Sequence, residues 1–517
     1  MSVSRQNRLR RCALTIGAVL SLGASQVFAD QPQSNDLVEG GPLLEASYPL
    51  LSSNVTQPIL ASAETPTTAE AAPDSEYQAL LDRIESLEAY KLDQEDAAAA
   101  KKKKSAYKLN GRIHLDNWLF SNSDPGINEL ENGIGNPGFD PENRWDFRRI
   151  RLTWTGTVPN NMNYRIQIDF HNPQTPELKD VYLGFTDLPH NHTFLIGIQK
   201  RPIGLDHLNS SRHNVFAERP LAVETFNEDA RRLGMCFYGL SDDESMNCRY
   251  GAFLLENITS DGAAIGDKEQ GGLYGRFAAS PWYDEISGGR GYYHWAISGS
   301  VNQTDGDGTT DVDTNSNEAR FRTRPEARSS NRWWNTGRIL GANQYQQLGV
   351  ESMLNIGAFS LTGEYIGNWV QRDASGGFNG DDLFFHGGYL YGCYFLTGEH
   401  IPLKRSSGTI DRVKPFENFF LVDRCRGGCG SGWGALALAL RGDYLDLSDS
   451  DINGGQGYTV TAGLNWYWTA YSKLQVNYIT GHISDAGQDV NNANATPFGT
   501  PLAGDFDIFG MRYMLDF

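Results

Sequence analysis

The chain has no long hydrophobic run beyond its amino terminus. The longest later stretch, from Ala435 to Leu440, is far shorter than the roughly 18 apolar residues that a membrane-spanning helix needs. The mean hydropathy is also low, at -0.46. These features exclude a helical membrane protein. They do not exclude a β-barrel, because every second residue of a barrel strand faces water and lowers the average.

The chain also lacks an excess of positive charge and a recognisable catalytic motif. Its 44 Lys and Arg residues against 63 Asp and Glu residues give a net charge of -19, which argues against nucleic acid as a partner. Its 10 His residues are scattered, with no GxSxG or HExxH pattern, so no nucleophile or metal-activated water is indicated. We therefore expect no enzyme activity, no cofactor and no metal site.

The amino terminus predicts export from the cytoplasm. Several arginines precede an apolar stretch from Ala13 to Ala24, and Val27 and Ala29 are the small residues that signal peptidase requires. We expect residues 1–29 to be a signal peptide that is removed on export. Residues 30–73 are rich in Ala, Thr, Ser and Pro, which predicts a flexible linker.

Residues 74–104 predict a short helix followed by a lysine-rich spacer. Tyr77, Leu80, Ile84 and Leu87 follow 3-4-3 spacing and share one face of a helix of barely two heptads. A helix of this length is unstable alone, which favours a coiled coil in an oligomer. The alternative is a single amphipathic helix docked on the rest of the chain. The spacer ends in the solvated basic run 101–104.

Residues 105–517 predict a transmembrane β-barrel. In the last nine residues, apolar side chains alternate with Gly, Arg, Met and Asp and the chain stops on Phe517, as in a strand with one face toward lipid. Sixteen alternating segments predict a 16-stranded antiparallel barrel, and an even number suits such a barrel. They lie near residues 107–120, 146–157, 162–171, 178–187, 193–200, 232–240, 247–256, 271–279, 291–302, 345–354, 358–369, 383–397, 433–446, 457–468, 471–482 and 505–517. The segment 398–432 is long where a short connection is expected, so it either folds into the barrel mouth or marks an error in the count.

Several segments resemble the phosphate-selective porin O/P family. They are GIQKRPIGLDHLNSSR at 197–212, FAER at 216–219, YLYGCYFLTGE at 389–399, VKP at 413–415 and the segment 434–447, which ends in RGDYLDL. The resemblance covers essentially residues 75–517. It implies a 16-stranded homotrimeric outer-membrane channel whose lumen passes anions, among them phosphate and polyphosphate, along a ladder of arginines and lysines. Arg212 lies in the first of these segments and is a candidate for the anion path.

Strand alternation supplies further anion-path candidates. Alternation with apolar residues places four arginines on the lumen side: Arg112, Arg149, Arg151 and Arg165. Guanidinium groups along a channel wall can replace part of an anion's hydration shell. The alternative is that these arginines pair with Asp116 and Asp169 on neighbouring strands and only line a wet wall.

The predicted loop 303–344 has an acidic first half and a basic second half. Arg320, Arg322 and Arg324 share one face if this part of the chain is extended, which predicts an anion funnel where the basic half folds over the pore. The alternative is a surface loop whose arginines pair with lipopolysaccharide phosphates or with the aspartates of the same loop. Those aspartates fit no complete calcium-loop pattern.

Cysteines predict two disulfide bonds. Removal of the signal peptide leaves five cysteines in an oxidising compartment. Cys236 and Cys248 lie symmetrically about a turn centred near Asp242, so we expect them to face each other across a hairpin and to bridge. Cys425 and Cys429 enclose Arg-Gly-Gly, which is flexible enough to close a small disulfide ring. A zinc site there would need further ligands.

These patterns together predict an outer-membrane porin of a Gram-negative-type bacterium, with its amino-terminal segment in the periplasm. We expect a passive diffusion channel for small anions, phosphate or polyphosphate above all. Its expected partners are small anionic solutes, outer-membrane lipid and two further copies of the chain. The alternatives are a general, non-selective diffusion porin and a non-conducting structural or adhesive barrel, which conductance and selectivity measurements separate.

Overall fold

The structure is a computed structural model. It describes residues 81–88, 90–91, 105–133, 138–228, 230–257, 269–306, 316–373, 380–419, 422–424, 428–430, 432–488 and 497–517. Contacts divide the chain into two compact units, Met1–Lys103 and Lys104–Phe517. The predicted signal peptide, residues 1–29, and the predicted linker, residues 30–73, lie outside the described residues.

The first unit contains a short helix. Residues 81–88 and 90–91 are helical, as the 3-4-3 spacing predicted. The side chains of Ile84 and Leu87 are 50% and 61% exposed, and the other two residues of the predicted apolar face lie outside the described part of the chain. Among the described residues, no helix has both the length and the apolar character needed to cross a membrane.

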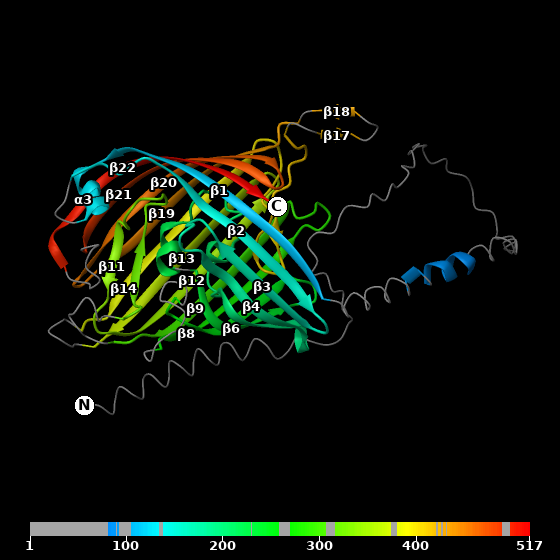
Figure 1. Ribbon diagram of the computed structural model, residues 1–517, viewed down its shortest axis with the longest axis horizontal. Helices are drawn as coiled ribbons and strands as arrows, with labels where there is room; N and C mark the ends of the chain where they lie inside the picture. The colour runs from blue at the N-terminus through cyan, green and yellow to red at the C-terminus, as the bar shows by residue number, and fades with distance from the viewer. Residues whose placement is uncertain are drawn as a thin grey trace, which may run out of the picture. The chain divides into compact units, whose positions relative to one another are not determined.

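Sixteen antiparallel strands form a closed barrel in the second unit (Figure 1). Each strand pairs with its neighbours in sequence, and β1 pairs with β22 to close the wall. In barrel order the strands are β1 (Ala106–Ser123), β2 (Arg144–Val158), β3 (Met162–Asp169), β4 (Glu177–Leu188), β5 (His192–Lys200), β6 (Arg231–Leu240), β7 (Met246–Leu254), β8 (Gly271–Tyr283), β9 (Gly291–Gln303), β12 (Ala342–Ile356), β13 (Phe359–Arg372), β14 (Leu383–Phe395), β19 (Ala435–Asp449), β20 (Ile452–Thr469), β21 (Ser472–Gln488) and β22 (Pro497–Asp516). They match the sixteen alternating segments one to one, so the predicted barrel is confirmed.

The barrel wall has an apolar outer face and a polar inner face. On β22, Tyr513 and Leu515 are exposed on the outside, whereas Arg512 and Asp516 are buried on the inside. This arrangement follows from the two-residue period of a strand. Exposed apolar residues on other strands include Leu109, Ile113, Phe147, Ile166, Leu183, Ile196, Ile297, Val350, Leu390, Leu438 and Val460. An outer face of this kind is expected where the wall meets lipid.

The connections leave the barrel at two rims. We call the rim that carries Ala106 and Phe517 the terminal rim, and we call the opposite rim the far rim. Because consecutive strands are antiparallel, the connections L1 (residues 124–143), L3 (residues 201–230) and L5 (residues 304–341) start at the far rim. L1 carries α3 (Pro125–Asn132), L3 carries α4 (Leu205–Leu208) and α5 (Leu221–Phe226), and L5 carries β10 (Arg320–Thr323) and β11 (Trp334–Arg338). The 3-10 turn η1 (Pro189–Asn191) joins β4 to β5 at the terminal rim.

The long connection 396–434 starts at the terminal rim and carries four short strands. They are β15 (Leu403–Lys404), β16 (Thr409–Ile410), β17 (Val422–Arg424) and β18 (Gly428–Gly430). The β15–β16 hairpin bends into the barrel, where Arg276 Nη2 donates a hydrogen bond to Gly408 O at 2.8 Å. Ile410 N donates to Asn209 Oδ1 of L3 at 2.9 Å. The segment therefore folds into the barrel mouth, and the strand count needs no correction.

The predicted disulfide between Cys236 and Cys248 is wrong. The β6–β7 register pairs Cys236 with Gly251 and Gly239 with Cys248, so the two side chains project from opposite faces of the sheet. Both thiols are free. The hairpin turns between Leu240 and Asn247, later than the predicted centre. Cys425 lies outside the described residues, so its bridge to Cys429 stays a prediction.

Candidate functional site

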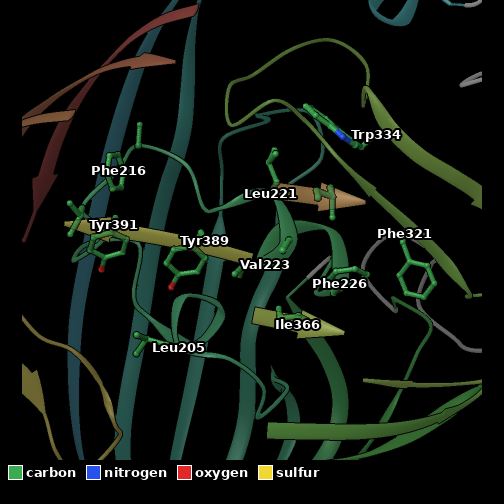
Figure 2. Packing of buried hydrophobic residues seen from close by; sticks show 14 of the residues in the cluster. Leu205, Phe216, Leu221, Val223, Phe226, Phe321, Trp334, Ile366, Tyr389 and Tyr391 are labelled. Carbon is green, nitrogen blue, oxygen red and sulfur yellow. The ribbon is translucent and has the colours of Figure 1, made fainter. Parts of the chain in front are cut away.

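L3 crosses the interior of the barrel and packs on several strands. Its apolar side chains meet the inner face of β14 and the tip of L5: the ring centroids of Phe216 and Tyr391 are 5.6 Å apart, and those of Phe226 and Phe321 are 5.8 Å apart. Figure 2 shows these contacts, with Leu221 and Val223 of α5 between them. L3 therefore narrows the lumen, and its apolar side chains hold it in place by packing on β14 and L5.

Hydrogen bonds hold L3 to two parts of the wall that are four strands apart. Glu364 on β13 accepts the amides of Leu205 at 2.9 Å and Asp206 at 2.6 Å. On β21, Asn477 accepts the amide of Ala217 at 2.9 Å, and Gln475 donates to Val215 O at 2.9 Å. Buried backbone groups need such partners, and polar residues on the inner wall supply them. The loop is thus fixed from β13 across to β21.

L5 also folds inward, with its arginines on one face. Glu326 accepts hydrogen bonds from Thr459 and Thr461 of β20 at 3.0 and 2.8 Å. On β10, Phe321 and Thr323 are buried, so the arginines at alternate positions share the other face, as predicted. These are Arg320, Arg322 and Arg324. Burial and the neighbouring Arg328 and Arg332 lower the pKa of Arg324 to about 9, which indicates crowded positive charge.

The partners of the three L5 arginines differ. Arg322 Nε lies 2.8 Å from Glu228 Oε1 of L3. Arg324 donates to the carbonyls of Ser329 and Ser330 at 2.9 and 3.3 Å. Burial and the adjacent Arg322 lower the pKa of Arg320 to about 10. This part of L5 folds against the inner wall, and four of its arginines pair with carboxylates: Arg322, Arg328, Arg332 and Arg338. The anion funnel stays a prediction.

Two wall arginines are buried without a carboxylate. Arg112 on β1 is 4% exposed and Arg149 on β2 is 3% exposed. Within the described residues, their Nε atoms have no hydrogen-bond partner, and no carboxylate lies within 4.0 Å of either guanidinium. Arg112 Nη1 contacts the hydroxyls of Ser211 at 2.7 Å and Ser210 at 3.5 Å on L3. The face of L3 toward β1 thus carries hydroxyls beside uncompensated positive charge.

The other predicted wall arginines are paired. Arg151 Nε lies 2.6 Å from Asp169 Oδ2, as the alternative interpretation proposed. Arg165 lies 3.2 Å from Asp180. Arg212 of L3 lies 3.3 Å from Asp516, a carboxylate that also lies 3.1 Å from Arg412. Sequence analysis thus identified the partner of Arg151 but not those of Arg165 and Arg212.

Sequence analysis did not select three charged residues of the site as candidates: Arg148, Glu218 and Arg512. Arg148 lies at a register shift between β1 and β2, where Arg149 opposes His114 and Phe147 opposes Leu115. This bulge turns Arg148 inward beside Arg149. Arg148 holds Glu218 of L3 by two hydrogen bonds, at 2.6 and 3.1 Å. Arg512 Nη2 lies 2.6 Å from the same carboxylate. No local pattern reveals the bulge, because it depends on pairing with β1.

The fold and these inward elements define a porin-type outer-membrane channel: a lipid-facing barrel whose lumen is narrowed by loops and lined by charged side chains. Residues 132–517 match the model of the family phosphate-selective porin O and P. The chain belongs to this family.

Similar proteins include one relative in sequence and several solved barrels. An uncharacterised protein of Caulobacter vibrioides is 26% identical over 423 residues, covering 80% of this chain and 74% of that protein. The anion-selective porin of Comamonas acidovorans is 10% identical at a TM-score of 0.44, covering 80% of this chain and 100% of that one. The outer-membrane channel DcaP of Acinetobacter baumannii is 10% identical at a TM-score of 0.43, covering 80% and 97%.

Proposed function

We propose that this porin is a passive, anion-selective channel with a preference for oxyanions of the phosphate class. The observation that carries the proposal is the pair Arg112 and Arg149, both buried on the inner wall with no carboxylate of the described residues within 4.0 Å. A buried charge without a counter-charge costs several kcal/mol. A permeating anion beside the two guanidinium groups supplies that counter-charge.

The groups around Arg112 suit an oxyanion. Ser210 and Ser211 contact its guanidinium, and their hydroxyls can donate hydrogen bonds while the guanidinium supplies charge-assisted ones. Several weak contacts of this kind replace hydration without holding the ion permanently, as conduction requires. The acidic total charge of the chain does not oppose this preference, because exposed charges beyond a Debye length of roughly 8 to 10 Å are screened.

Planar-bilayer recording of the purified channel under a KCl gradient tests the proposal. The reversal potential of the unmodified channel is expected to lie toward the equilibrium potential of chloride. Added phosphate should reduce the chloride current. Arg112→Gln and Arg149→Gln should each move the reversal potential toward potassium and weaken the phosphate effect. Arg83→Gln, in the separate helical unit, is the control and should change neither. Anion preference that survives both wall substitutions would overturn the proposed path.

A general diffusion porin is the second candidate. The observation that favours it is the pairing of many inner arginines, among them Arg151, Arg165 and Arg212, with carboxylates. A wall whose arginines are neutralised by carboxylates selects only weakly between anions and cations. A reversal potential near zero in the unmodified channel would establish this candidate, and the absence of any current would leave the non-conducting barrel.

We also propose a homotrimer in the outer membrane, with the amino-terminal segment in the periplasm. The helical residues 81–88 and 90–91 expose Ile84 and Leu87, and so short a helix gains stability from self-association. Native mass spectrometry of the detergent-extracted protein should give three copies. Deletion of residues 75–91 should weaken the trimer while leaving the barrel folded, and a monomeric mass for the intact protein would refute the proposal.

A further inference from the structure

The connection 396–434 passes from the lumen to the outer side of the barrel at the terminal rim. On the lumen side, Arg412 Nη1 lies 3.1 Å from Oδ2 of Asp516, which is buried on the inner face. Seven residues later, Phe419 N donates a hydrogen bond to Trp468 O at the end of β20, at 2.7 Å. Figure 1 shows the β17–β18 hairpin, which follows in the chain, outside the barrel. The connection therefore has one part inside the channel and one part outside it.

The outer part of the connection packs on an outward-facing side chain of the wall. On β20, Tyr458 and Leu464 are exposed on the outside, and the two-residue period of the strand places Trp466 on the same face. The ring centroids of Phe419 and Trp466 are 4.6 Å apart. The indole Nε1 of Trp466 also donates to Trp433 O at 2.7 Å. Both ends of this outer part are thus held on the outer face of β20.

Two large aromatic side chains of this region remain exposed. The side chain of Trp433 is 80% exposed, and that of Phe416 is 66% exposed. We call these two residues, together with Phe419 and Trp466, the rim patch. Lys414 is also exposed and precedes Phe416 by two residues. A contiguous exposed apolar surface of this kind indicates a contact with a membrane or with another molecule.

The rim patch is continuous with the lipid-facing wall. β19 begins two residues after Trp433, and Leu438 and Leu440 on its outer face are 48% and 59% exposed. Aromatic side chains are enriched at the level where a membrane-spanning wall meets the lipid headgroups. A basic side chain such as Lys414 is attracted to anionic headgroups. These features favour phospholipid as the partner of the rim patch.

We propose that the rim patch is a membrane anchor that binds phospholipid of the leaflet at the terminal rim. The rings of Trp433 and Phe416 insert between the headgroups and the first carbons of the acyl chains, and Lys414 contacts the lipid phosphates. Phe419 and Trp466 attach the patch to the wall. Lipid binding at this position is independent of which ions the channel passes.

Fluorescence quenching by phospholipid that is brominated near the headgroup end of its acyl chains tests the anchor. In liposomes of this lipid, the fluorescence that Trp433→Phe removes should be quenched about twofold or more, and acrylamide in the water should quench it only weakly. Trp334→Phe, at a fully buried tryptophan of L5, is the matched control, and the fluorescence that it removes should respond to neither quencher. Phe416→Trp adds a reporter to the rim patch and should add fluorescence that the brominated lipid quenches.

Hydrogen exchange in liposomes gives a second measurement of the anchor. Phe416→Gln/Trp433→Gln removes the two exposed rings and should speed exchange in residues 411–419 about tenfold, because local opening no longer requires withdrawal from the lipid. Exchange in residues 403–410 should stay unchanged, because Arg276 and its neighbours hold this hairpin in the lumen.

Three results would overturn the anchor. Quenching of Trp433 by acrylamide but not by the brominated lipid would place the rim patch in water. Protection from both quenchers would mean that a protein surface, such as a second copy of the chain, covers it. Unchanged exchange in the double variant would mean that the two rings do not hold the connection at the membrane.

Discussion

Two pairs of arginines on the inner wall are equally buried but differ in their partners. Arg112 and Arg149 are 4% and 3% exposed, and Arg276 and Arg441 are 3% and 1% exposed. Within the described residues, the first pair has no carboxylate within 4.0 Å, whereas Arg276 forms an ion pair with Glu351 and Arg441 forms ion pairs with Glu326 and Asp443. Burial and residue type alone therefore do not distinguish a wall arginine with a carboxylate partner from one without.

The paired arginines join inserted elements to the wall. Arg441 on β19 binds Glu326 of L5, packs its guanidinium 4.4 Å from the ring centroid of Phe216, and donates to the carbonyl of Glu218 at 3.1 Å. Arg276 on β8 links Glu351 of β12 to the β15–β16 hairpin. These contacts tie L3, L5 and the β15–β16 hairpin to the wall.

Loss of Arg441 should have the largest effect on stability. Arg441→Gln leaves Glu326 and Asp443 buried without a cation, and breaking a buried ion pair in this way costs about 3–5 kcal/mol. The free energy of unfolding, measured by urea titration of tryptophan fluorescence in liposomes, should fall by that amount. Arg149→Gln should raise it or leave it unchanged, because the substitution removes a buried charge that has no carboxylate within 4.0 Å. Similar losses in both variants would erase the distinction between the two pairs.

The sequence was sufficient to predict the strands of the barrel wall and to place the wall arginines on its inner face. Alternation is a local property, so Arg112, Arg149 and Arg151 could be assigned to the polar face from their neighbours alone. Partners are not local: Glu218 and Arg512 are 294 residues apart, and their contact exists only because L3 folds through a closed barrel. No pattern within either segment contains that information.

Register is the other property that the sequence did not determine. The bulge that turns Arg148 inward depends on how β2 pairs with β1. The predicted bridge between Cys236 and Cys248 failed for the same reason, since the register differs from the predicted one by three residues and an odd shift moves a side chain to the opposite face. The sequence did not determine whether the β15–β16 hairpin folds into the barrel, because the partners of the hairpin lie on distant strands.

An intermediate effect is expected at the contact between L1 and L5. Glu131 of α3 accepts the amides of Ser330 and Asn331 at 2.6 and 3.2 Å and the Trp333 indole at 2.9 Å. Glu131→Ala leaves these donors without acceptors, which costs about 1–3 kcal/mol locally. Hydrogen exchange should become faster in residues 324–334 and not in L3, and open-channel noise should increase. Glu142→Ala on the same connection is the control. An unchanged rate of hydrogen exchange in L5 would show that the fold of L5 does not need its hydrogen bonds to Glu131.

The smallest effect is expected where a carboxylate has two arginines. Asp180 lies 3.2 Å from Arg165 and 2.6 Å from Arg231, so Arg165→Gln leaves it with a strong partner. The side chain of Arg165 is also 28% exposed, and exposed pairs contribute only about 0.2–1 kcal/mol. We expect unfolding free energy to fall by no more than this, and the reversal potential to shift less than in Arg149→Gln. The same two measurements on Arg231→Gln, which removes the closer partner of Asp180, should give a larger loss of stability. If Arg165→Gln instead matched Arg149→Gln in selectivity, pairing with a carboxylate would not be what separates the two kinds of wall arginine.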